Sequence, residues 1–213
     1  MDPVFLFVIL ALILSIVIHE AAHGYMADML GDPTARLQGR LTLNPLRHID
    51  PLGSIIIPGI LVLTQANILF GWAKPVPYNP YNLRNQKWGE ALVAAAGPGV
   101  NIFLALFFGL LIRTGIADAV SPLFATLIWY VVHLNVLLAF FNLIPIPPLD
   151  GSKILKALLP LRGQMAFARF EAFTAQYGFL VLFLFIFLFM SVAWPYFAQL
   201  VMWVEFAITG RVL

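Results

Sequence analysis

The chain has 213 residues, of which 62% are hydrophobic and only 10% are charged. A soluble domain carries about 25% charged residues, so this balance excludes an ordinary soluble protein and is typical of an integral membrane protein. The sequence contains no cysteine, which excludes disulfide bonds and thiolate metal sites. The formal charge of +2 comes without a basic stripe, and we therefore expect no nucleic-acid partner.

Five apolar blocks, without a repeat or a linker between them, predict one all-α polytopic membrane domain over residues 1–213. A helix that crosses a bilayer needs about 20 residues, and three of the blocks fit one crossing each. These three form the expected core, which further helices follow towards the C-terminus. The blocks are residues 3–28, 52–70, 90–112, 122–146 and 178–209.

The first block ends in SIVIHEAAHGY, residues 15–25, which places two histidines and a glutamate in a helix suited to lipid. His19 and His23 are four residues apart, so on a helix they lie on one face about 6 Å apart, as two ligands of one metal ion require. Glu20 is turned about 100° away and can take a proton from water beside the metal. This is the H-E-x-x-H pattern. The alternative is a pair of interfacial histidines. It is disfavoured because inserting each ionisable group into the membrane costs several kcal/mol.

Two segments between the first and second core helices predict a small β element. Residues 37–43 alternate apolar and polar side chains, which is the period of a strand. Residues 71–78 contain two prolines that suit an edge strand. The first strand would hold an extended substrate by strand addition, or it belongs to an ordinary loop hairpin. His48 is expected to lie at the interface, paired with Asp50, and a role as metal ligand is the less favoured alternative.

The second apolar block, residues 52–70, is long enough to cross the bilayer but is interrupted by Pro58, Gly59 and polar residues. If it enters and leaves on the same side, most Lys and Arg residues fall on one side of the membrane, whereas a full crossing removes this bias. We therefore expect a re-entrant segment, an N-terminus outside the cell and a basic cytoplasmic face. Broken backbone at this depth is tolerated where protein or a wet cavity covers it.

Two further blocks carry features of helix packing. Residues 90–112 contain GPGVN at 97–101, whose small side chains predict close approach of a neighbouring helix. Asn101 is expected to fix a loop or helix near the site. The last block, residues 178–209, is interrupted near Pro195, so we expect either two short helices or one crossing and an interfacial helix.

The block at residues 122–146 leads into NLIPIPPLDG at 142–151, where three prolines end the helix at membrane depth. Supplying Asp150 as a carboxylate ligand to the metal explains such an unwound segment. The alternative is that Asp150 is the N-cap of a helix that starts near Ser152. His133 lies about 25 Å along a continuous helix from Asp150, so we expect it to pack in the interior.

Together, HEAAH at 19–23, GPGVN at 97–101 and NLIPIPPLDG at 142–151 resemble the three signatures of the site-2 protease family, which are intramembrane zinc metalloproteases. The patterns H-E-x-x-H, G-P-x-x-N and N-x-x-P-x-P-x-L-D-G are matched at every fixed position. The resemblance covers the core from about residue 3 to residue 151. In contrast to some relatives, the chain carries no recognisable PDZ or CBS-like domain.

The resemblance implies that one zinc ion is bound by His19, His23 and Asp150 and that Glu20 is the catalytic base. It also implies that Asn142 faces the substrate, where its amide would bind the substrate backbone or the developing oxyanion. Zinc in such a site polarises the scissile carbonyl and makes water more acidic.

The expected function is hydrolysis of peptide bonds in or near transmembrane segments of membrane-anchored protein substrates. The site is expected in the cell membrane, towards the cytoplasmic side. His19 and His23 share a metal with Asp150 only if the ends of their two helices face the same side, which also requires that residues 52–70 do not cross. A zinc-dependent membrane transporter is an alternative, which the gathering of ionisable groups at one end disfavours. A catalytically silent binding homologue is another, which the intact Glu20 disfavours.

Overall fold

The computed structural model describes residues 2–64 and 71–211, and these residues form helices, turns and loops without a β-strand. Four helical stretches in them are long and apolar enough to cross a membrane. They are Pro3–Met29, Gly89–Arg113, Pro122–Asn142 and Phe183–Thr209. The predicted class, an all-α polytopic membrane protein, is confirmed.

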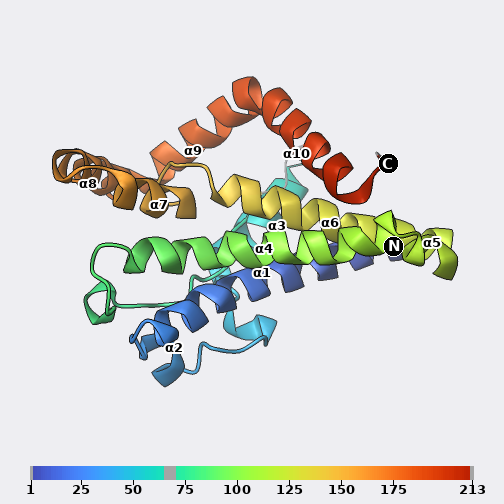
Figure 1. The fold of residues 1–213 in the computed structure, drawn as a ribbon. Helices are drawn as coiled ribbons and strands as arrows, with labels where there is room; N and C mark the ends of the chain where they lie inside the picture. The colour runs from blue at the N-terminus through green and yellow to red at the C-terminus, as the bar shows by residue number, and fades with distance from the viewer. Residues whose placement is uncertain (1, 65–70, 212–213) are drawn as a thin grey trace.

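Three long helices form the core: α1 (Pro3–Met29), α4 (Gly89–Arg113) and α6 (Pro122–Asn142). α4 packs along both α1 and α6, which also contact each other. Figure 1 shows that α1 and α6 run in the same direction and that α4 runs the opposite way. The last turns of α1 and α6 and the first turn of α4 therefore lie at one end of the bundle. We call it the α7 end, after the helix α7 (Asp150–Leu158) that lies there.

Prolines and capping side chains start two of the core helices. Asp2 accepts a hydrogen bond from the backbone N–H of Val4 (2.9 Å) at the start of α1, and Ser121 accepts one from Phe124 (3.0 Å) at the start of α6. A proline follows each cap, where its missing N–H leaves no helical hydrogen bond unmade. Along α4, small buried residues let the neighbouring helices approach closely. They are Gly89, Ala91, Ala94, Gly97, Ala105 and Gly109.

The segment between α1 and α4 contains short helices and turns instead of the predicted strands. They are α2 (Thr34–Leu37), η1 (Pro45–Arg47), η2 (Pro51–Ile56), α3 (Ile57–Leu63) and η3 (Pro80–Asn82). The strand predicted for residues 37–43 is wrong. Leu37 ends a helical turn, and Gly39 has a φ of +63°, a left-handed conformation that a regular strand does not contain. Residues 71–78 have no regular secondary structure and form no strand either.

The predicted re-entrant segment, residues 52–70, is helical over most of its described part. The π-helical turn η2 leads directly into α3, which ends at Leu63, and residues 65–70 lie outside the described residues. The structure does not establish a re-entrant course, which stays a prediction. The backbone N–H of Arg84 donates to the carbonyl oxygen of Leu30 (2.8 Å), so the chain leaves α1 and enters α4 at the same end of the bundle.

Five more helices complete the described chain. A short helix, α5, joins α4 to α6 at the end opposite to α7 (Figure 1). Helix α8 follows α7, and the last two helices, α9 and α10, form a bent pair joined by a π-helical turn, η4. This turn ends at Ala193, two residues before Pro195, which interrupts the last apolar block. The bounds are α5 (Ile116–Val120), α8 (Leu161–Gln176), α9 (Gly178–Leu188), η4 (Phe189–Ala193) and α10 (Trp194–Thr209).

Helix α10 packs on α4 and α6, and an intramembrane pair joins it to α6. Nδ1 of His133 lies 2.7 Å from Oε1 of the buried Glu205, and the His133 ring stacks on Trp129 with centroids 5.1 Å apart. The His133 side chain is 34% exposed, so it lies at the edge of the contact between α6 and α10 and not in the interior that the sequence predicts. It also has a carboxylate partner that no sequence pattern indicated.

Candidate metal centre

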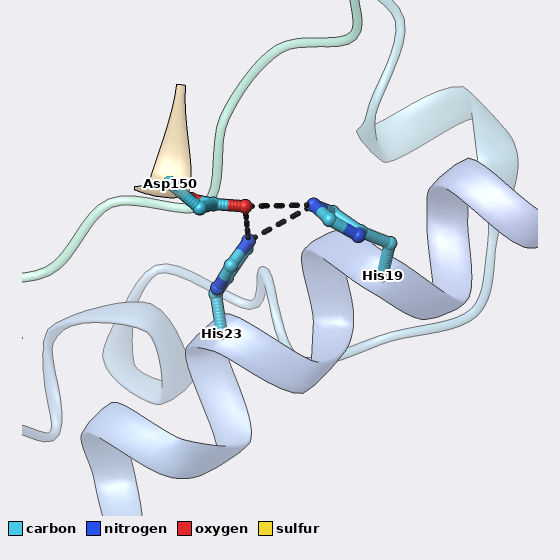
Figure 2. Close-up of side chains that lie close together, drawn as sticks. All are labelled: His19, His23 and Asp150. Atoms are coloured by element: carbon cyan, nitrogen blue, oxygen red, sulfur yellow. Dashed lines mark hydrogen bonds and ion pairs between the residues drawn. The ribbon is translucent and has the colours of Figure 1, made fainter. Parts of the chain in front are cut away.

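His19, His23 and Asp150 bring three ligand atoms together at the α7 end of the core (Figure 2). The Nε2 atoms of His19 and His23 lie 3.1 Å apart, and Oδ2 of Asp150 lies 3.2 Å from the first and 3.3 Å from the second. All three residues are buried. The histidines come from successive turns of α1, and Asp150 is the first residue of α7.

Each histidine ring is held from behind by α4. Nδ1 of His23 lies 2.7 Å from the carbonyl oxygen of Val93, and Nδ1 of His19 lies 2.6 Å from Oδ1 of Asn101. Gly97 lies midway between these two contacts, and a Cβ there would come within 2.5 Å of the His23 ring and 2.6 Å of the His19 ring. Val93, Gly97 and Asn101 are spaced by four residues, so one face of α4 forms the back wall of the site.

A chain of buried hydrogen bonds decides which nitrogen of His19 carries its proton. Asn135 donates from Nδ2 to the carbonyl oxygen of Val131 (2.8 Å), so its Oδ1 is left to accept from Nδ2 of Asn101 (2.8 Å). Oδ1 of Asn101 then faces His19, whose Nδ1 must donate to it. Neutral His19 therefore carries its proton on Nδ1 and a lone pair on Nε2.

The three atoms that face one another all carry lone pairs. A backbone carbonyl only accepts, so the contact with Val93 places the proton of His23 on Nδ1 as well. Oδ2 of Asp150 is buried with no hydrogen-bond partner among the described residues. Three acceptors within 3.3 Å of one another repel unless a cation lies between them. The arrangement is therefore that of a metal site.

Asp150 reaches the histidines because α7 begins directly beside the end of α6. Gly151 permits this approach, since a Cβ there would lie 2.1 Å from the carbonyl oxygen of Leu143. The N-cap of α7 is Leu149, and no side chain caps this helix, so the alternative role of Asp150 as an N-cap is wrong. A metal ion requires the carboxylate form of Asp150, and a cation between the three facing atoms favours that form.

Glu20 lies next to His19 on α1 but outside the group of three ligands. Its side chain is partly buried, and Oε2 accepts a hydrogen bond from the backbone N–H of Val76 (3.0 Å). Residue 76 belongs to residues 71–79, which have no regular secondary structure, so this stretch passes beside the site.

Comparisons with known proteins agree with this geometry. Residues 109–185 match the family model described as Peptidase family M50. A protein of Bacillus subtilis with the name "Putative zinc metalloprotease YwhC" is 39% identical over 204 residues, which cover 89% of this chain and 84% of that protein. The chain belongs to peptidase family M50. The resemblance to site-2 proteases is thereby confirmed.

Two mycobacterial relatives of this M50 peptidase share less sequence. The Mycolicibacterium smegmatis protein named "Putative zinc metalloprotease Rip2" is 32% identical over 178 residues, which cover 84% of this chain and 65% of that protein. Its namesake in Mycobacterium tuberculosis strain Erdman is 32% identical over 182 residues, which cover 85% of this chain and 68% of that protein. No solved structure matches the chain closely.

The ligand set of this M50 peptidase suits zinc. Two imidazole nitrogens and one carboxylate oxygen form a common catalytic zinc set, with bonds of about 2.0–2.2 Å. Tetrahedral bonds of that length keep the ligand atoms about 3.3 Å apart, close to the observed separations of 3.1, 3.2 and 3.3 Å. Three protein ligands also leave one position open, as catalytic zinc sites require.

Two polar residues that the sequence singled out form no hydrogen bond with the M50 ligand group among the described residues. Nδ2 of Asn142 donates to the carbonyl oxygen one turn earlier in α6 (2.9 Å), and no hydrogen bond in the described residues joins it to the ligands. Nε2 of His48 bonds the carbonyl oxygen of Thr42 (2.8 Å), so the predicted pairing of His48 with Asp50 is wrong. The side chain of Asp50 instead accepts from the backbone N–H of Gly53 (2.7 Å) and caps η2.

Sequence reasoning missed the parts of the site that carry no motif. The sequence patterns do not predict the direct contact of Asn101 with His19, and no motif includes Asn135. The signal that points to Asn135 is an amide within an apolar helix, because a polar group in lipid needs a hydrogen-bond partner.

Proposed function

We propose that the chain is an intramembrane zinc metalloprotease that hydrolyses peptide bonds in or near transmembrane segments of membrane-anchored proteins. One observation carries the proposal: His19, His23 and Asp150 form a buried group of facing lone pairs at the end of a membrane helix. Membership of peptidase family M50 supports peptide hydrolysis at this metal site. The names of the relatives as zinc metalloproteases support zinc as the ion.

Glu20 is the general base in the proposed mechanism. Zinc bound by the three ligands supplies a Lewis acid that polarises the scissile carbonyl and acidifies water. Glu20 accepts a proton from the attacking water and later passes it to the leaving amine. The N–H of Val76 occupies Oε2, so Oε1 remains available for the proton.

Asn142 contacts the substrate in this proposal. A transmembrane helix hides its carbonyl groups in hydrogen bonds between residues four apart, so the substrate unwinds before cleavage. Asn142 is the last residue of α6 and is partly exposed. Release of its bond to α6 lets Nδ2 donate to the substrate backbone or to the developing oxyanion.

The proposed topology places the N-terminus outside the cell and the metal site towards the cytoplasm. The hydrogen bond between Arg84 and Leu30 supports a path in which residues 52–70 do not make a single full crossing. With that path, the Lys and Arg residues of the 30–88 segment and of α7 and α8 share one side, which the positive-inside rule assigns to the cytoplasm.

Cleavage of a membrane-tethered reporter by the purified protein tests the function. Glu20→Gln keeps the size of the side chain and all three ligands, so the variant should keep its zinc. It should lose cleavage by the 10²–10⁴-fold or more that is typical of a removed acid–base group. Glu171→Gln is the matched control, since Glu171 lies in α8 and pairs with Lys156 at 2.6 Å; it should cleave like the wild type. A Glu20→Gln enzyme within about tenfold of the wild type would sink the mechanism.

A further inference from the structure

We propose that residues 72–79, which we name the strap, hold the catalytic carboxylate of Glu20 in position through the backbone N–H of Val76, and that Arg40 fixes the strap. The inference rests on the proposed function, in which Glu20 moves the proton. Glu20 is the group that reacts, whereas Val76 and Arg40 act through it as positioning residues.

The first link is the contact between the strap and Glu20. The N–H of Val76 donates to Oε2 of Glu20 at 3.0 Å. A glutamate side chain has three rotatable bonds, and holding it in one arrangement costs rotamer entropy. A backbone N–H aimed at one carboxylate oxygen offsets that cost with a charge-assisted hydrogen bond and leaves the other oxygen free.

The local sequence of the strap presets the direction of this N–H. Pro75 and Pro77 flank Val76 and have no N–H of their own, so the donor at 76 is the only backbone donor of residues 75–77. A residue before proline is restricted to extended conformations, and both Lys74 and Val76 precede prolines. The donor is therefore held on an extended chain before any substrate arrives.

The second link is Arg40, which is buried at 8% exposure. Its Nη2 donates to the carbonyl oxygens of Lys74 (3.0 Å) and Pro75 (3.3 Å), directly before Val76. Among the described residues Arg40 forms no ion pair, and its Nε is buried without a partner. A buried guanidinium without a carboxylate is costly, and its observed hydrogen bonds go to the strap. Arg40 thus clamps the two residues that set the position of Val76.

Further contacts fix the strap on both sides of Val76. The N–H of Lys74 donates to the carbonyl oxygen of His48 (2.8 Å), and the N–H of Asn79 donates to Oδ2 of the fully buried Asp32 (2.7 Å). The Val76 side chain packs against α1 at Gly24, where a Cβ would lie 2.8 Å from it. A segment held at so many points is a fixed wall of the site. The alternative is that the strap blocks the site as an inhibitory segment, which would have to leave before each turnover.

Replacement of Val76 by proline tests the first link, because proline removes the N–H and keeps a small apolar side chain. Val76→Ala is the matched control, since it keeps the N–H and removes two methyl groups. We expect Val76→Pro to lower kcat on the reporter about 10–100-fold, the loss typical of a misplaced catalytic group. KM should stay within about twofold and zinc content should be unchanged, and Val76→Ala should keep kcat within about threefold. Incorporation of the α-hydroxy acid analogue of valine at position 76 replaces only the N–H and should reproduce the proline result.

Arg40→Met should lower kcat in the same way, and Arg40→Lys should restore part of the loss, because an ammonium keeps donors for the strap carbonyls. Unchanged kcat in both Val76→Pro and the hydroxy acid variant would overturn the proposal. A rise in kcat would also overturn it, because the strap would then be an inhibitory segment. A rise in KM alone would overturn it as well, because the strap would then be a substrate-binding element. These outcomes differ from failure of the proposed function, in which Glu20→Gln and the wild type cleave alike.

Discussion

At the scale of single residues, a polar network behind the ligands joins the three core helices. Asn101 of α4 and Asn135 of α6 are wholly buried, and Nδ2 of Asn135 also donates to Oγ of Ser15 in α1 (3.0 Å). A buried amide without a partner costs about 1–3 kcal/mol, so the network is stable only when all its members are in place. Its end point is Nδ1 of His19. The packing of the core and the proton position of a metal ligand therefore depend on the same hydrogen bonds.

Replacing Asn101 should weaken zinc binding without removing a ligand. In Asn101→Leu, Nδ1 of His19 loses the acceptor that orients its ring, and loss of such a supporting contact typically lowers metal affinity 10–100-fold. Competition with a chelator on the purified protein measures this. Asn142→Leu makes the same change at the end of α6, where the amide bonds only its own helix in this structure, and should keep wild-type affinity. Equal losses in the two variants would contradict a role of Asn101 through His19.

Metal binding and proton transfer should separate in two conservative variants. Asp150→Asn replaces a carboxylate by a neutral amide, which is a poorer ligand for a divalent cation, so zinc and cleavage should fall together. Glu20→Gln should lose cleavage and retain zinc. Elemental analysis and single-turnover cleavage on the same samples measure both quantities. Normal zinc content in both His23→Ala and Asp150→Ala would show that the metal is bound elsewhere.

At the scale of the elements, the site depends on how closely α4 and α7 approach their neighbours. Gly97 brings α4 against the two histidine rings, and Gly151 brings α7 against the end of α6. Both glycines lie inside signature runs, of which the first predicts close helix packing and the second an unwound segment. Their positions show that these runs also set the distances within the ligand group.

Two glycines of the GPGVN run give a matched comparison on one helix. A Cβ at Gly97 would lie 2.5–2.6 Å from the histidine rings, whereas a Cβ at Gly99 meets nothing within 4 Å. Gly97→Ala should therefore displace the rings and lower both zinc affinity and cleavage at least tenfold, the size of effect seen when a ligand's support is disturbed. Gly99→Ala should keep both and stabilise α4 by about 0.5–1 kcal/mol. Thermal unfolding in detergent checks that the Gly97→Ala protein is folded; wild-type zinc affinity in that protein would refute the close approach.

A feature of the fold can be predicted from the sequence where the spacing of residues along the chain determines it. The long apolar blocks and the H-E-x-x-H spacing predict membrane helices and a pair of facing histidines, because helix geometry alone fixes both. The alternation in residues 37–43 misleads, since the left-handed φ of Gly39 leaves no trace in a polarity pattern. Asn135 and the strap were missed because their roles arise from contacts between residues far apart in the chain, such as Val76 with Glu20.

At the scale of the whole molecule, the outer surface is that expected of a membrane protein. Large apolar side chains on the outer faces of α1, α4, α9 and α10 are exposed, as expected of surfaces that meet lipid. Examples are Leu10, Phe103, Phe183 and Trp203. The ligands lie near the end of the bundle at which α1 ends and α4 begins (Figure 1). An unwound substrate and water therefore need to reach only one end of the core.

The side of the membrane that this end faces can be tested with single cysteines, because the wild-type chain has none. Arg47 and Lys87 are exposed in the segment between α1 and α4, and Ala119 is exposed in α5 at the opposite end. With the N-terminus outside and residues 52–70 not crossing, Arg47→Cys and Lys87→Cys should react with a membrane-impermeant maleimide only after the cells are permeabilised. Ala119→Cys should react in intact cells.

Labelling of Arg47→Cys and Lys87→Cys from opposite sides would refute the re-entrant path. Labelling of Arg47→Cys and Lys87→Cys in intact cells would show the opposite orientation. The positive-inside bias of the basic residues would then have predicted the wrong side of the membrane.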